Sequence, residues 1–61
     1  MEESIMFKKN FTVIEHKNGK TYETHLSGKR QEILKDIQAF KDVNSGCKMV
    51  ETSKRLVIWD N

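Results

Sequence analysis

Residues Lys29–Val43, with the sequence KRQEILKDIQAFKDV, are the stretch on which the predicted fold depends. Their apolar side chains recur at spacings of three and four, so they share one face of a helix. The apolar residues of this face are Ile33, Leu34, Ile37 and Phe40. A helix of about 15 residues with one apolar stripe is marginal in water on its own. The rest of the chain must therefore supply an apolar surface that covers it.

Both ends of this segment carry residues that start or stop helices. Ser27 and Gly28 precede it, and either is a suitable N-cap. Asn44 and Gly46 follow it, and an Asn or a Gly supplies the left-handed conformation in which many helices end. The sequence therefore predicts one helix between these two signals.

Asn18-Gly19 predicts a hairpin between a strand at Ile5–His16 and a second strand that precedes the helix. Asn-Gly favours a two-residue type I′ turn, because both positions need positive φ. If Lys17 lies opposite Lys20, the apolar residues of both strands fall on one face, which fixes the register. The predicted pairs are Phe11 with Leu26, Val13 with Thr24, Glu15 with Tyr22, Ile14 with Glu23, Thr12 with His25 and His16 with Thr21.

Residues 47–59 predict a second hairpin, with strands at Cys47–Glu51 and Lys54–Trp59 and a turn at Thr52-Ser53. The pairs expected from this turn are Glu51 with Lys54, Met49 with Leu56 and Cys47 with Ile58. One longer, bent strand over the same residues is the alternative, because the turn contains neither Gly nor Asn.

The predicted elements follow the order β-β-α-β-β within one domain that spans residues 1–61. The fold class is α+β, with one helix packed on one face of a mainly antiparallel sheet. This order is similar to the β-grasp architecture of ubiquitin-like and immunoglobulin-binding domains, which implies a mixed sheet with the helix across it. If residues 47–59 are one strand, a β-β-α-β layer that dimerises edge to edge is expected instead.

Composition sets the class of protein only broadly. Eleven basic and nine acidic residues give a net charge of +2, which is weak evidence for a nucleic-acid or membrane partner. The one cysteine excludes an intramolecular disulfide and a multi-cysteine zinc site, and it favours a reducing compartment. No apolar run approaches the length of a membrane span, so we expect a cytoplasmic protein without a membrane partner.

No residue pattern predicts catalysis, a metal or a cofactor. His16 and His25 share one face of the first hairpin but lie on the order of 13 Å apart, too far to share one metal ion. Cys47 lacks a CxxC partner and is interpreted as a small apolar core residue. Lys29 and Arg30 precede the first helical turn and could bind a phosphate or carboxylate, although the simpler interpretation is that both charges point into water.

The predicted partner-binding surface is the sheet face that the helix leaves uncovered. Apolar and aromatic side chains on such a face typically mark an interaction site. The residues expected there are Ile14, Lys48, Val50, Arg55, Val57 and Trp59. Slipping the second hairpin by one residue would instead turn Trp59 into the core.

Two functions fit this surface. The first is a small non-catalytic protein-interaction module, either a homodimer or a regulator that binds a larger protein; the Lys-, Asn-, Glu- and Ile-rich composition suits an AT-rich bacterial or phage genome. The alternative is a single-stranded nucleic-acid-binding protein that stacks and neutralises the strand on this face. Its candidate residues are Tyr22, Trp59, Lys48, Arg55, Lys8 and His25, and the interleaved carboxylates of Glu15, Glu23 and Glu51 count against it.

Overall fold

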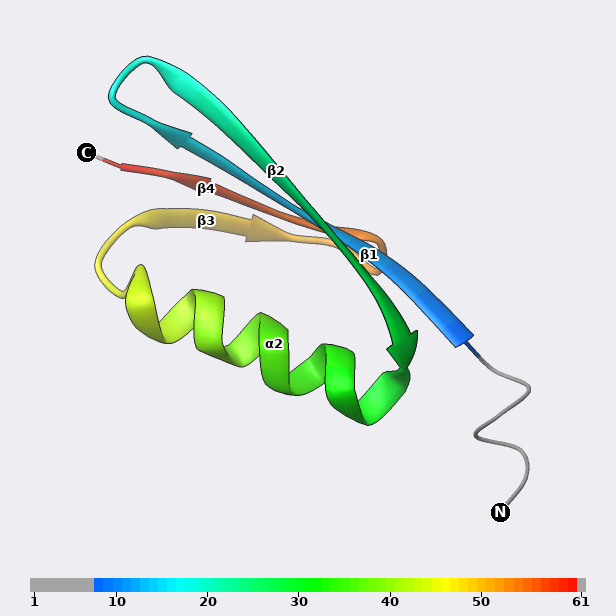
Figure 1. Cartoon of the computed structure of the whole chain (residues 1–61). Coiled ribbons are helices and arrows are strands. Elements are labelled where there is room, and N and C mark those ends of the chain that lie inside the picture. The colour runs from blue at the N-terminus through cyan, green and yellow to red at the C-terminus, as the bar shows by residue number, and fades with distance from the viewer. Residues whose placement is uncertain (1–7, 61) are drawn as a thin grey trace.

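The computed structural model describes residues 8–60, which form one sheet and one helix in the predicted order β-β-α-β-β (Figure 1). The part of the first predicted strand before residue 8 and the ends of the predicted domain lie outside the described residues. The elements are β1 (Lys8–Lys17), β2 (Lys20–Lys29), α2 (Arg30–Val43), β3 (Lys48–Glu51) and β4 (Arg55–Trp59). The predicted α+β class is therefore confirmed.

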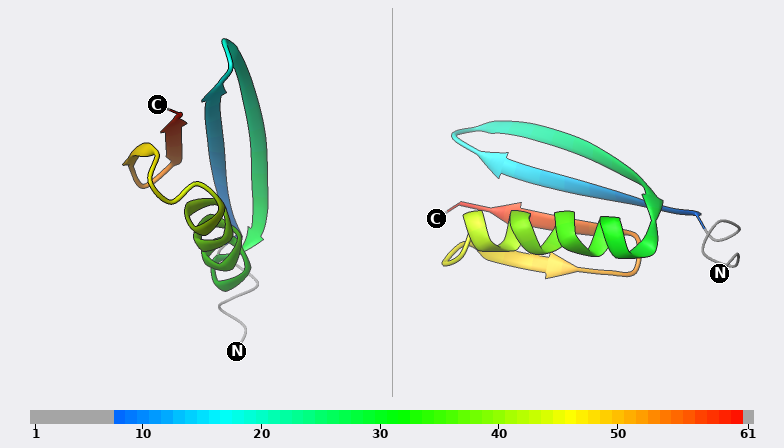
Figure 2. Two further views of the ribbon diagram at one scale, coloured as in Figure 1. Left: turned by 90° about the vertical axis from the view of Figure 1, so that its left-hand side faces the viewer. Right: turned by 60° about the horizontal axis from the view of Figure 1, so that its bottom comes forward.

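The four strands form one mixed sheet in the order β2-β1-β4-β3. The outer pairs, β1 with β2 and β3 with β4, are antiparallel, whereas the central strands β1 and β4 run parallel. Helix α2 lies along one side of the sheet (Figure 2). Residues 48–59 form two strands, so the alternative of one long strand is wrong. The element order that resembles the β-grasp architecture is present.

The first hairpin has the predicted register at every pair. Lys17 lies opposite Lys20, and the pairing continues to Lys8 opposite Lys29. Asn18 and Gly19 have φ values of 54° and 74°, as a type I′ turn requires. The turn and the apolar pattern thus agree with the observed register along both ten-residue strands.

The second hairpin turns one residue later than predicted, at Ser53-Lys54. The Thr52 hydroxyl accepts hydrogen bonds from the backbone N–H groups of Lys54 (3.2 Å) and Arg55 (3.1 Å), which supplies the turn without Gly or Asn. The predicted pairs are wrong by two residues; the observed ones are Glu51 with Leu56, Val50 with Val57, Met49 with Ile58 and Lys48 with Trp59. A shift of two residues leaves each side chain on its predicted face.

The core lies between α2 and the centre of the sheet. Its buried residues are Phe11, Val13, Ile33, Ile37, Leu56 and Ile58, and Leu26, Phe40, Cys47 and Met49 pack against them. Two predicted members are largely outside it: Leu34 is 46% exposed and Tyr22 is 50% exposed. Helix α2 buries side chains of the central strands β1 and β4. Leu34, on the flank of the helix, and Tyr22, on the edge strand β2, therefore keep much of their contact with water.

Asn44, only 2% exposed, closes the end of α2 against β1. Its amide donates hydrogen bonds to the Phe40 carbonyl oxygen (2.8 Å) and to Glu15 Oε2 (3.3 Å), and its oxygen accepts one from Lys17 Nζ. Gly46, with φ of 93°, provides the positive φ at this helix end.

At the other end of α2 the N-cap is Lys29, which makes no side-chain capping bond, and not the predicted Ser27 or Gly28. Those two residues belong to β2, because the strand continues directly into the helix. The helix therefore begins directly where strand β2 ends, at Arg30.

We expect Asn44→Ala to lower the free energy of unfolding by about 1–3 kcal/mol, because it removes three hydrogen bonds that the buried amide makes to part-buried partners. The measurement is urea denaturation followed by far-UV circular dichroism. The matched control is Ser45→Ala, an exposed neighbour, for which a change within about 0.5 kcal/mol is expected. Equal effects from both substitutions would contradict this role of Asn44.

Candidate functional site

The sheet face turned away from α2, called the outer face here, brings together all six residues of the predicted partner-binding surface. Strand pairing places its side chains in three rows that cross the strands. From β2 to β3, the first row is Thr21, His16, Trp59 and Lys48, and the second is Glu23, Ile14, Val57 and Val50. The third row is His25, Thr12 and Arg55.

The centre of the outer face is an apolar row made by Ile14, Val57 and Val50 on three adjacent strands. Val50 is 48% exposed, and the other two are half-buried by their neighbours. Within residues 8–60 the one helix lies on the opposite side of the sheet, so it does not cover this row (Figure 2). The row is therefore a continuous apolar strip open to a binding partner.

Trp59 stands on the outer face between two neighbours. Its ring stacks on His16, with a centroid separation of 5.7 Å and an interplanar angle of 18°, and Lys48 Nζ lies 5.4 Å from its centroid. Because His16 is on β1 and Lys48 is on β3, they flank the indole from opposite sides of β4. The alternative that places Trp59 in the core is wrong. Its ring faces are engaged within the chain, and its edge is available for contact.

Polar groups occupy the β2 side of the outer face. The His16 ring is held by Thr21, whose hydroxyl lies 3.1 Å from Nδ1, and the Thr12 hydroxyl lies 3.2 Å from His25 Nδ1. His25 Nε2 is 3.5 Å from Glu23 Oε1, and both side chains are largely exposed, so this contact contributes little stability. These groups form a polar border beside the apolar row.

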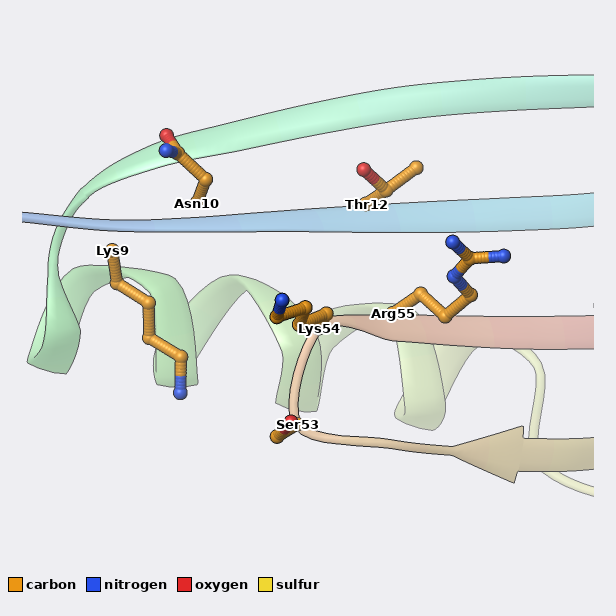
Figure 3. A pocket seen from close by; sticks show the side chains of 6 residues that line it. All are labelled: Lys9, Asn10, Thr12, Ser53, Lys54 and Arg55. Carbon is orange, nitrogen blue, oxygen red and sulfur yellow. The ribbon is translucent and has the colours of Figure 1, made fainter.

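A basic hollow, called the notch here, opens where β1 extends beyond the first residue of β4 (Figure 3). Its volume is about 640 Å³, and it is lined by Lys9, Asn10, Thr12, Ser53, Lys54 and Arg55. No carboxylate lines it, and the described residues give its three cationic side chains no carboxylate partner. This hollow could not be predicted from the sequence, because the parallel pairing that joins residue 12 to residue 55 has no local signal.

The other predicted binding residues do not gather into one basic patch. Arg55 belongs to the notch, whereas Lys48 contacts Trp59 at the opposite end of β4, with the apolar row between them. Tyr22 lies on the helix side of β2, and the side chain of Lys8 lies outside the described part of the structure. The cations of the proposed nucleic-acid surface are therefore divided between two places.

Lys29 and Arg30, the predicted anion site, are the N-cap and the first residue of α2. Both side chains are exposed, and neither lines the notch. The helix N-terminus thus carries two cations at the surface without an enclosing site.

Residues 8–60 contain no group of three or more His, Cys, Asp or Glu side chains that could hold a metal ion. The described helix is too short and too polar to cross a membrane. No protein-family model, curated protein or solved structure matches this chain. The functional interpretation therefore rests on the geometry of the chain itself.

We expect His16 and Trp59 to stabilise each other by about 0.5–1.5 kcal/mol, the range typical of stacked aromatic pairs. A double-mutant cycle of His16→Ala and Trp59→Ala, measured by urea unfolding, gives this coupling. The control cycle combines His25→Ala with Trp59→Ala. His25 lies on the same face as Trp59 but in the third row. Its coupling to Trp59 should stay below about 0.5 kcal/mol, and equal couplings in both cycles would argue against the stack.

Proposed function

We propose that this protein is a small non-catalytic protein-interaction module, a regulator that binds a larger protein through its outer face. The observation that carries the proposal is the apolar row of Ile14, Val57 and Val50, which is open on a sheet face that residues 8–60 leave uncovered. An exposed apolar strip rimmed by polar residues is typical of protein-binding surfaces.

The surroundings of the row have the chemistry of a small interface. Its centre is apolar, Trp59 lies beside it in the first row, and Arg55 lies beside it in the third. Interfaces typically have an apolar centre and a polar rim, and Trp and Arg contribute much of their binding energy. Because His16 and Lys48 hold Trp59 on the surface, the indole loses little side-chain freedom when a partner contacts it.

The size of the molecule limits how a partner is bound. A standard interface covers about 800 Å² on each partner, whereas the whole chain exposes 4686 Å². We infer that a partner contacts all three rows together, with Lys48 at one end and Arg55 at the other.

The test is site-specific photo-cross-linking in the cells that produce the protein. A benzophenone side chain replaces Val50 on the outer face or Ala39 on the exposed side of α2. The Val50 position should give one dominant protein adduct that the Ala39 position does not give. The same set of adducts from both positions would contradict a binding site on the outer face.

The identified partner then allows a quantitative measurement with purified proteins. Val50→Glu should weaken binding roughly tenfold or more, because an unpaired carboxylate would be buried at the interface. Ala39→Glu adds the same charge away from the site and should change the dissociation constant less than about twofold. Equal binding by the Val50→Glu variant and the unchanged protein would overturn the proposal.

The notch favours a second candidate, binding of single-stranded nucleic acid. Lys9, Lys54 and Arg55 line one hollow that has no lining carboxylate, so they could neutralise backbone phosphates. Base stacking, however, needs a free aromatic face, and His16 and Lys48 already flank the ring of Trp59. We therefore place this candidate second.

Fluorescence anisotropy with a labelled single-stranded oligonucleotide, at about 50 and 200 mM salt, separates the two candidates. The primary proposal predicts no saturable binding at either salt concentration. Micromolar binding that weakens steeply with salt would instead favour the second candidate. In that case the combined change of Lys9, Lys54 and Arg55 to Gln should weaken binding at least tenfold more than the equal change of Lys20, Lys29 and Lys35, which lie outside the notch.

A further inference from the structure

Strand β2 is a long open edge of the sheet. It is ten residues long, and its neighbour in the sheet is β1 alone. Lys17 and Lys20 flank the two-residue turn, so the even-numbered residues of β2 exchange backbone hydrogen bonds with β1. The N–H and C=O groups of Thr21, Glu23, His25 and Ser27 then point outward, and no backbone hydrogen bond joins them to another segment of residues 8–60.

We propose that this edge binds a second copy of the chain. The two β2 strands pair antiparallel about a two-fold axis, with Thr24 opposite Thr24 of the second copy, and the two sheets become one continuous sheet. The proposal goes beyond the proposed function, because it uses the edge of the sheet, whereas the regulator's partner is bound on the outer face.

Two symmetric registers pair nine residues of β2 with nine of the second copy, residues 20–28 when Thr24 is at the centre and residues 21–29 when His25 is at the centre. In a two-fold pair the same residues meet twice, so each complementary contact is doubled. With Thr24 at the centre, Glu23 lies opposite His25 of the second copy, and the reciprocal pair is identical. A centre at Glu23 would set two carboxylates directly against each other, and a centre at His25 would oppose two imidazoles. A carboxylate and an imidazole N–H can form a hydrogen bond across the strands, whereas two carboxylates repel each other.

The ends of β2 also fit this register. Lys20 lies opposite Gly28 of the second copy, and Lys29 lies opposite Gly19. No two lysines therefore face each other, although the strand has one at each end. The terminal charges, which normally protect a sheet edge from pairing, do not oppose this arrangement.

The helix side of β2 supplies apolar contact in the same register. Tyr22 lies opposite Leu26 of the second copy, twice, and these are the apolar side chains of β2 on that side. Tyr22 is half exposed in the single chain, and Leu26 packs only at the margin of the core. Pairing would cover both, and aromatic–aliphatic cross-strand pairs stabilise antiparallel sheets.

The other edge of the sheet is a poorer site for a second copy. Strand β3 is four residues long, and the bond from the Thr52 N–H to the Arg55 carbonyl oxygen (2.8 Å) fixes which of its residues face β4. Only Met49 and Glu51 of β3 then direct backbone groups outward. Edge pairing there would form fewer hydrogen bonds than pairing along β2.

The test is sedimentation velocity of the full chain from about 1 μM to 1 mM, because weak dimers have dissociation constants in this range. We expect a concentration-dependent dimer. His25→Glu should weaken it at least tenfold by opposing two carboxylates, whereas Glu23→His combined with His25→Glu exchanges the two side chains and should restore the affinity to within about threefold. Val50→Glu, on the outer face, should leave it unchanged within about twofold.

A covalent test of the register uses Thr24→Cys in a Cys47→Ser background. Thr24 and its copy form a non-hydrogen-bonded pair, whose Cα atoms lie about 4.5 Å apart, a separation that a disulfide can span, so a disulfide should form across the axis. Glu23→Cys in the same background is the offset control and should cross-link at least tenfold more slowly. A monomer at 1 mM, or a dimer weakened by Val50→Glu and insensitive to His25→Glu, would overturn the proposal. The first outcome leaves the proposed function intact, because the outer face does not depend on this edge.

Discussion

The rest of the structure depends on the parallel pairing of β1 with β4. It is held at its ends by the hydrogen bonds from the Thr12 N–H to the Lys54 carbonyl oxygen (3.1 Å) and from the Asp60 N–H to the His16 carbonyl oxygen (3.2 Å). On the helix side it places Val13 beside Leu56, both fully buried beneath α2. Without it the chain would consist of two separate hairpins, and a two-stranded ribbon alone is marginally stable at best.

The same pairing generates the candidate site. It aligns Ile14 with Val57, which builds the apolar row, and it aligns His16 with Trp59, so that their rings stack. It also sets Thr12 beside Arg55 and leaves the start of β1 extending beyond β4, which opens the notch. One backbone register therefore positions an apolar strip and an aromatic group on the sheet face opposite the helix, and it opens a cationic hollow beside the start of β4.

The sequence predicted the features that local chemistry controls. Asn18-Gly19 indicated the first hairpin, and period-two alternation assigned Val50, Val57 and Trp59 to the outer face even though the pairing of the second hairpin is shifted by two residues. The displacement came from the Thr52 hydroxyl, which makes a turn that composition does not reveal. The notch was unpredictable, because its two sides are joined only by long-range pairing, and the exposure of Leu34 depends on where the helix crosses the sheet.

The central claim is that the β1–β4 register sets Trp59 and Val57 on the outer face. Its most direct test is a set of interproton nuclear Overhauser effects from these two side chains in solution. The account predicts contacts between the rings of Trp59 and His16, and between the methyl groups of Val57 and Ile14. Contacts from Trp59 to the buried methyl groups of Ile33 and Ile37 would contradict it, because they would place the indole in the core beneath the helix.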